Sequence, residues 1–182
     1  KAGADNADPV ETDHTVKIPR PTIVGGKTSD KAVYQKNETA HYTLTATNPD
    51  EKIIGRNLTF EDTVEVDYVE ILADSIKVVN PAGKDITKKC EITAEKTHFF
   101  VKTGRDIKPG ETYTLTYDMT FSEDSPVGEK VPNTFIPMVD GASFAAEYDT
   151  TVPGAPDVKA VKSCDPENGS TVHTGDEIEY HI

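Results

Sequence analysis

The chain has 182 residues and a formal net charge of −13 at pH 7, from 32 acidic and 19 basic side chains. This balance argues against a nucleic-acid-binding protein, which needs clustered basic side chains, and is typical of a solubilising acidic surface. Acidic side chains also bind Ca²⁺, but the sequence has no loop of the EF-hand type, so we expect no metal and no cofactor.

Two stretches near the two ends of the sequence repeat one another. Residues 11–16 match residues 147–152 at an offset of 136, and residues 21–30 match residues 156–165 at an offset of 135. A repeat of such a long period is typical of tandem modules. We therefore predict three units: the C-terminal strand of a preceding module over 1–19, a complete module over 20–153, and the N-terminal strands of a following, truncated module over 154–182.

Alternation of apolar and polar residues dominates the complete module and is typical of half-buried strands. Lys27 opens the first expected strand. The further expected strands cover, in chain order, residues 41–48, 57–64, 75–80, 90–95, 97–103, 113–121, 133–139 and 144–152. Gly and Pro supply turns between them, as in NPDE and IKPGE. Many short strands separated by turns predict an all-β fold, an antiparallel immunoglobulin-like β-sandwich.

The segments beside these strands carry weaker patterns. Residues 66–76 are the best helix candidate, although we favour an extended or loop conformation with a short helical turn as the alternative. The proline-rich residues 18–21 and 152–156 favour extended connectors between modules. Cys90 and Cys164 fall in different predicted modules, so we expect free thiols, with an inter-module disulfide as the alternative.

Three side chains of the complete module have chemistry that could combine: Lys27 in the first strand, Asp62 in a middle strand and Asn133 at the start of a late strand. First and last strands of a sandwich can lie side by side, with a middle strand facing them across the core. Burial would favour a neutral lysine amine, which is a nucleophile, and a protonated carboxylic acid. Attack of the amine on the asparagine carbonyl would then expel ammonia and leave an amide.

Simpler roles for these residues remain open at this point. A strand lysine is ordinarily solvated, Asp62 could cap a turn, and Asn133 could simply mark the start of a strand. Asn133 and Asn57 each also fit a glycosylation sequon. Glu61 stands beside Asp62, but alternation places Asp62 on the apolar side of its strand.

Several ordered motifs resemble one family. They are GGKTSDKAVYQKNETAHYTLTATNP (25–49), IIGRNLTFEDTV (53–64), IKPGETYTLTYDMTF (107–121), VGEKVPNTF (127–135) and KSCDPENGSTVHTGDEIEYHI (162–182). With these motifs the chain resembles the DUF11-like and isopeptide-forming repeat modules of bacterial surface proteins, including Gram-positive adhesins and pilin-like fibres. Pro137 departs from the smoother late strand of that family.

The resemblance implies an isopeptide bond between Lys27 and Asn133, assisted by the acid Asp62. It makes Lys162 the equivalent lysine of the truncated next module, whose asparagine would lie beyond residue 182. We expect the exposed strands of the incomplete end modules to pair between molecules, because unpaired strand edges invite such pairing.

The expected function is that of a structural stalk module of an extracellular protein at the bacterial cell surface or cell wall, neighboured by further modules of the same polypeptide. A host ligand would be bound by other domains, and this segment would not enter a membrane. The alternative is a ligand-binding adhesin module that recognises a host protein or glycan. Self-crosslinking is a single-turnover event, so neither interpretation makes the protein an enzyme.

Overall fold

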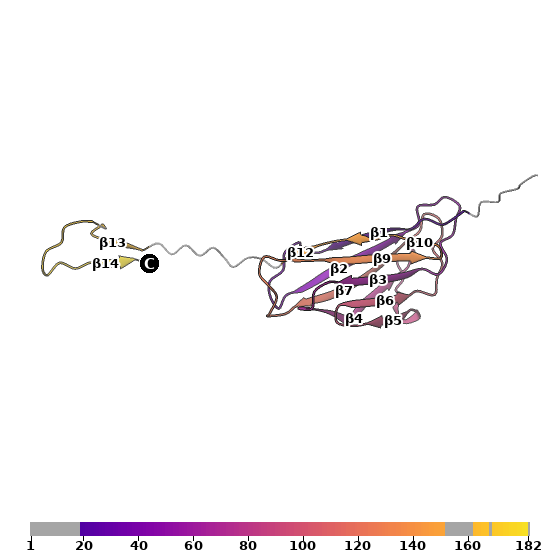
Figure 1. Ribbon diagram of the computed structural model, residues 1–182, viewed down its shortest axis with the longest axis horizontal. Helices are drawn as coiled ribbons and strands as arrows, with labels where there is room; N and C mark the ends of the chain where they lie inside the picture. The colour runs from indigo at the N-terminus through magenta and orange to yellow at the C-terminus, as the bar shows by residue number, and fades with distance from the viewer. Residues whose placement is uncertain (1–18, 152–161, 168, 182) are drawn as a thin grey trace, which may run out of the picture.

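The computed structural model describes residues 19–151, 162–167 and 169–181 (Figure 1). Residues 19–151 form an antiparallel β-sandwich of two sheets, and the immunoglobulin-like all-β prediction is confirmed. The first sheet has the order β1 (Val24–Ser29), β2 (Thr39–Thr47), β7 (Thr112–Phe121), β4 (Val69–Val79). The second has the order β10 (Ala142–Ser143), β9 (Asn133–Val139), β3 (Thr59–Val64), β6 (His98–Lys102), β5 (Glu91–Ala94), with β11 (Ala146–Glu147) also paired to β9.

Smaller elements complete the described structure. A two-stranded pair joins β8 (Lys130–Val131) to β12 (Thr150–Thr151), and a 3₁₀ turn, η1 (Thr87–Lys89), precedes β5. A separate hairpin consists of β13 (Ser163–Asp165) and β14 (Glu179–His181). None of the described segments forms a helix with the length and apolar character needed to cross a membrane.

The core lies between the two sheets and follows the alternation of the sequence. In β7 every second residue is buried, from Tyr113 to Phe121, and the residues between them are threonines and one aspartate on the outer face. Its neighbour β2 repeats this arrangement with Tyr42, Leu44 and Ala46 inward. Period-two burial on both partners fixes the register of the pair, because a shift by one residue would turn the apolar side chains to solvent.

The segment 66–76, for which we favoured an extended or loop conformation over a helix, lies mostly in a strand. Residues 69–79 form β4, and its register to β7 shifts between Leu72 and Lys77. Within the shift the hydroxyl of Ser75 donates to the Leu72 carbonyl oxygen at 2.5 Å and accepts the backbone N–H of Asp118 at 2.8 Å. The serine thus replaces backbone hydrogen bonds that the bulge interrupts, and the bulge explains why the sequence lacks clean alternation here.

The expected strand over 144–152 is divided. Its first part is β11, paired to β9, and its second part is β12, paired to β8. Between them the backbone N–H of Tyr148 donates to the carbonyl oxygen of Asn133 at 3.0 Å. This end of the module therefore runs along the start of β9, beside the residues described next.

Candidate functional site

Lys27 enters the core from β1, at the edge of the first sheet. The sequence suggested that Lys27 is the first residue of this strand, but it is the fourth. Its side chain is fully buried. Two glycines precede it, and β1 leans there against β9. A Cβ atom on Gly25 would lie 3.0 Å from the Cδ and Cγ atoms of Pro137. The absence of a side chain thus lets β1 come close to β9.

Asp62 and Asn133 lie on neighbouring strands of the second sheet. Asp62 pairs with Phe135 and Val64 pairs with Asn133 in the β3–β9 register, so the two polar residues are diagonal neighbours that both face inward. The expected arrangement was wrong in this respect. The strand of the acid does not face the strand of the asparagine across the core but pairs with it, and the lysine comes from the opposite sheet.

The three side chains meet at the lysine amine. Lys27 Nζ donates a hydrogen bond to Asp62 Oδ2 at 2.5 Å and another to Asn133 Oδ1. Asp62 and Asn133 are 0% and 1% exposed. The structure therefore brings together the three residues that the sequence singled out, with the amine in contact with the amide group that it would attack.

A fourth side chain, Tyr117 of β7, completes this cluster. Its hydroxyl donates to Asp62 Oδ1 at 3.0 Å and accepts from Asn133 Nδ2 at 2.8 Å. The alternation of the sequence indicates only that Tyr117 belongs to a strand of the sheet. Its inward position was predictable from the alternation, but several tyrosines share that property, and only the sheet stacking shows which hydroxyl reaches the acid.

Aromatic rings enclose the cluster. Tyr42 and Tyr117 stack with ring centroids 5.0 Å apart, and Phe99 meets Tyr117 edge-on at 5.1 Å. Lys27 Nζ lies 5.4 Å from the Tyr42 ring centroid and 5.9 Å from that of Tyr117. These rings exclude water, while their π faces retain some attraction for a cationic amine.

Burial changes the protonation of the pair. It lowers the pKa of Lys27 to about 8, although Asp62 opposes this shift by its charge and hydrogen bond. It raises the pKa of Asp62, against the effect of the Lys27 charge, and the pKa of Tyr117 lies well above its usual value for the same reason. Desolvation thus favours a neutral amine beside a neutral acid, which are the forms that amide formation requires.

The remaining sequence candidates lie elsewhere. Glu61 points to the outer face, where its Oε1 is 3.1 Å from His98 Nε2. Lys162 precedes β13, and its Nζ lies 4.1 Å from the ring centroid of Tyr180 in the same hairpin. Cys90 and Cys164 are free thiols. The first copy of the repeat at residues 11–16 and the expected proline-rich connector at residues 152–156 lie outside the described residues.

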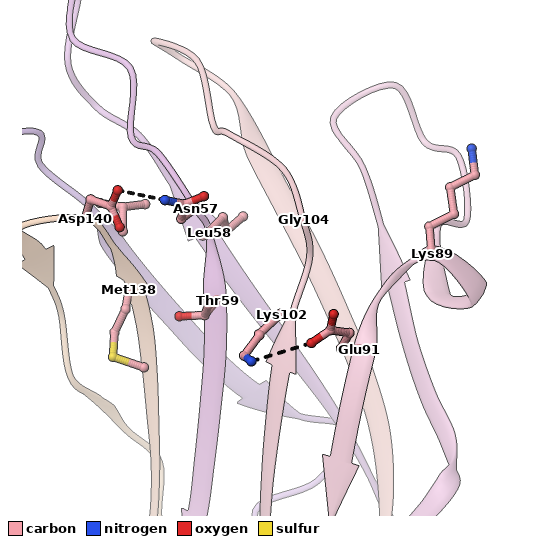
Figure 2. A pocket seen from close by; sticks show the side chains of 10 residues that line it. Asn57, Leu58, Thr59, Lys89, Glu91, Lys102, Gly104, Met138 and Asp140 are labelled. Carbon is pink, nitrogen blue, oxygen red and sulfur yellow. Dashed lines mark hydrogen bonds and ion pairs between the residues drawn. The ribbon is translucent and has the colours of Figure 1, made fainter.

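A surface hollow is the competing candidate for a binding site. It has a volume of about 460 Å³ on the second sheet, between the start of β3 and the ends of β6 and β9 (Figure 2). Four of its polar side chains form two pairs: Asn57 Nδ2 donates to Asp140 Oδ2 at 2.7 Å, and Lys102 Nζ lies 3.5 Å from Glu91 Oε2. Because these pairs are exposed to solvent, they are weaker evidence for a functional site than the buried cluster.

Comparisons with known proteins agree with this fold. Residues 10–151 match the family described as the cell surface antigen I/II C2 terminal domain. No curated protein sequence matches the chain significantly. Among solved structures, the pilus backbone RrgB of Streptococcus pneumoniae is similar, with a TM-score of 0.53 and 15% identity over 65% of this chain and 52% of that chain.

Two further structures show the same likeness of fold. The major pilin subunit BcpA of Bacillus cereus has a TM-score of 0.53 and 13% identity, over 80% of this chain and 41% of that chain. The N-terminal domain of the Streptococcus gordonii adhesin Sgo0707 has a TM-score of 0.54 and 16% identity, over 74% and 32%. The chain thus spans about half or less of each of these proteins.

Proposed function

The chain belongs to the cell surface antigen I/II C2 terminal domain family of Gram-positive surface adhesins, and we propose that it is a stalk module closed by an intramolecular isopeptide bond between Lys27 and Asn133. The module would hold other parts of its polypeptide away from the cell and bear tension. Modules before and after it in the same chain would be its principal partners.

One observation carries the proposal: the Lys27 amine is hydrogen-bonded to the Asn133 amide oxygen and to Asp62 in a site from which solvent is excluded. A structural ion pair would need only the lysine and the acid. An amide with its carbonyl group against the amine adds an electrophile, and proximity of this kind replaces an improbable encounter by an intramolecular step.

The reaction balances without an external reagent. The neutral Lys27 amine attacks Asn133 Cγ, and the carbonyl oxygen takes up negative charge that the nearby dipoles stabilise. The protonated Asp62 assists by exchanging protons with the amine, to which it is hydrogen-bonded. Collapse of the intermediate breaks the bond from Cγ to Nδ2. The former lysine amine gives up one proton and the leaving nitrogen gains one, so that ammonia departs and a secondary amide joins the two strands.

The intact mass of the purified chain tests the bond. We expect the wild-type protein to weigh one ammonia less than its sequence requires, and Lys27→Ala and Asn133→Ala each to show the full sequence mass. Asp62→Ala should also retain the ammonia, because the acid is needed although it is not joined. A folded wild-type protein of full mass would refute the proposal, and crosslinking in Asp62→Ala would show that the acid is wrongly assigned.

A further inference from the structure

We propose that Tyr117 is a catalytic residue of this crosslinking reaction, relaying a proton from Asp62 to the nitrogen that leaves Asn133. This inference rests on the proposed Lys27–Asn133 bond. It concerns how the leaving group is protonated, a step that the lysine, the acid and the asparagine do not perform by their mutual contacts alone.

The hydrogen bonds of the site form a closed ring of four groups. Lys27 Nζ donates to Asp62 Oδ2, and Tyr117 donates to Asp62 Oδ1 at 3.0 Å. Asn133 Nδ2 donates to the Tyr117 oxygen at 2.8 Å, and Asn133 Oδ1 accepts from Lys27. The two carboxylate oxygens thus have different partners: Oδ2 contacts the attacking amine, and Oδ1 contacts the tyrosine hydroxyl.

This division sets the route of the proton. The two carboxylate oxygens of Asp62 are hydrogen-bonded to Lys27 and Tyr117, and the leaving nitrogen of Asn133 is hydrogen-bonded to Tyr117. A tetrahedral intermediate expels neutral ammonia readily but an amide anion only with great difficulty, so a proton must reach Nδ2 before the bond breaks. General acids act on atoms within hydrogen-bonding distance, and the Tyr117 hydroxyl is at that distance.

The transfer requires only a reversal of the hydroxyl. In the starting amide Nδ2 is planar and acts as a donor. After attack it becomes pyramidal and gains a lone pair, so that the Tyr117 O–H can turn to donate to it. This turn also reverses the hydrogen bond between Tyr117 and Asp62, so that the proton of the neutral acid lies on Oδ1 and is donated to the Tyr117 oxygen. Lys27 then gives one proton to Asp62 Oδ2, the acid gives its own proton from Oδ1 to the Tyr117 oxygen, and the tyrosine proton passes to Nδ2.

Protons balance over these three transfers. Lys27 loses one, the leaving nitrogen gains one, and Asp62 and Tyr117 finish with as many protons as they had at the start. The acid has exchanged its proton from one oxygen to the other. The raised pKa of Tyr117 suits this role, because the hydroxyl stays neutral throughout and never needs to persist as a buried phenolate.

The test compares two tyrosine-to-phenylalanine variants on the same face of β7. Tyr117→Phe removes the hydroxyl and keeps the stacked ring. Tyr113→Phe is the matched control, since Tyr113 is also inward and its hydroxyl reaches only the Asp106 carbonyl oxygen in the hydrogen bonds described, at 3.4 Å. Each protein is made by cell-free synthesis, and ammonia loss is followed by intact mass against time.

We expect Tyr117→Phe to lose ammonia about 100-fold more slowly than wild type, since a positioned general acid contributes on the order of 10²–10⁴-fold. Tyr113→Phe should react at the wild-type rate. Equal rates for Tyr117→Phe and wild type would overturn the relay and leave the bond standing. A folded wild-type protein that never loses ammonia would overturn the relay together with the bond.

A second measurement needs no variant and covers the case in which Tyr117→Phe does not fold. The wild-type reaction rate is measured in mixtures of H₂O and D₂O. A relay moves several protons together, so the rate should fall along a curve as the deuterium fraction rises. A linear dependence, which indicates a single proton in flight, would overturn the relay.

Discussion

The reactive state of the buried pair contains one proton shared by two groups. Lys27 must be neutral to attack and Asp62 must be protonated to assist, so the productive form has the same net charge as the ordinary ion pair. Removal of the last proton abolishes the acid, and addition of a second proton abolishes the nucleophile. The two groups therefore titrate as one coupled unit.

A bell-shaped pH profile follows for the rate of ammonia loss. Above the Lys27 pKa of about 8 the pair loses its last proton, so the rate should fall about tenfold per pH unit. Below the Asp62 pKa, which burial raises above the ordinary carboxyl value, the pair gains a second proton and the rate should also fall. Initial rates from intact mass measure the profile, with circular dichroism as the control for folding. A rate that keeps rising from pH 8 towards the ordinary lysine pKa would show that the acid is dispensable.

The sequence predicts the identities of the reacting residues better than their arrangement. Alternation places Asp62 rather than Glu61 inward, and the family motifs single out Lys27 and Asn133; the structure brings these three side chains together. Two features of the site could not be predicted from the sequence. Period-two patterns do not state which strands pair, so the pairing of β3 with β9 was missed, and the partners of Tyr117 depend on that pairing.

The approach of β1 to β9 determines whether the lysine reaches the asparagine. Pro137, which looked like an irregularity in the late strand, is the residue that packs on Gly25. Proline interrupts a backbone ladder, yet β9 keeps its register to β3 on both sides of it. The irregular residue of β9 and the glycine of β1 thus form one complementary contact.

Gly25→Val should disrupt this contact and slow crosslinking. The new Cβ would meet Pro137 at 3.0 Å and the Phe144 Cδ1 atom at 3.2 Å, and two further methyl groups would force the strands apart. Overpacking of this kind costs about 1–3 kcal/mol, so the variant should unfold at lower denaturant concentration as well as lose ammonia more slowly. Thr28→Val is the control, because this exposed position of β1 accepts the same side chain at no cost in packing. Wild-type kinetics in Gly25→Val would mean that the close approach does not matter.

The patterns of other elements show where sequence reasoning stops. The strands β2, β7 and β9 follow strict alternation, and their predicted ranges agree with the structure within two residues. The segment 66–76 was expected to be extended or a loop rather than a defined strand, because the bulge in β4 breaks the period of two and Ser75 supplies the hydrogen bonds that backbone partners would otherwise make. A side chain that replaces backbone hydrogen bonds in this way produces no alternating pattern by which the strand could be predicted.

The proposed bond would change the path of mechanical force through the module. Lys27 and Asn133 are 106 positions apart, so the bond would close a loop that contains most of the sandwich. In the unfolded chain a crosslink over about 100 residues removes conformational entropy equivalent to about 4.7 kcal/mol of stability in the chain-entropy model. Under tension, force would pass from β1 directly to β9 and bypass the strands between them.

Stretching the chain from its two ends tests this consequence. In wild type the 106 positions inside the bond cannot extend. The Asn133→Ala variant releases them, and at 3.3–3.6 Å per residue its unfolding should lengthen the chain by about 35–38 nm more than that of the wild type. Thr134→Ala, at the adjacent outward-facing position of β9, should extend like wild type. Equal extension of wild type and Asn133→Ala would contradict the crosslink, because a covalent bond between β1 and β9 withstands forces that unfold an unlinked sandwich.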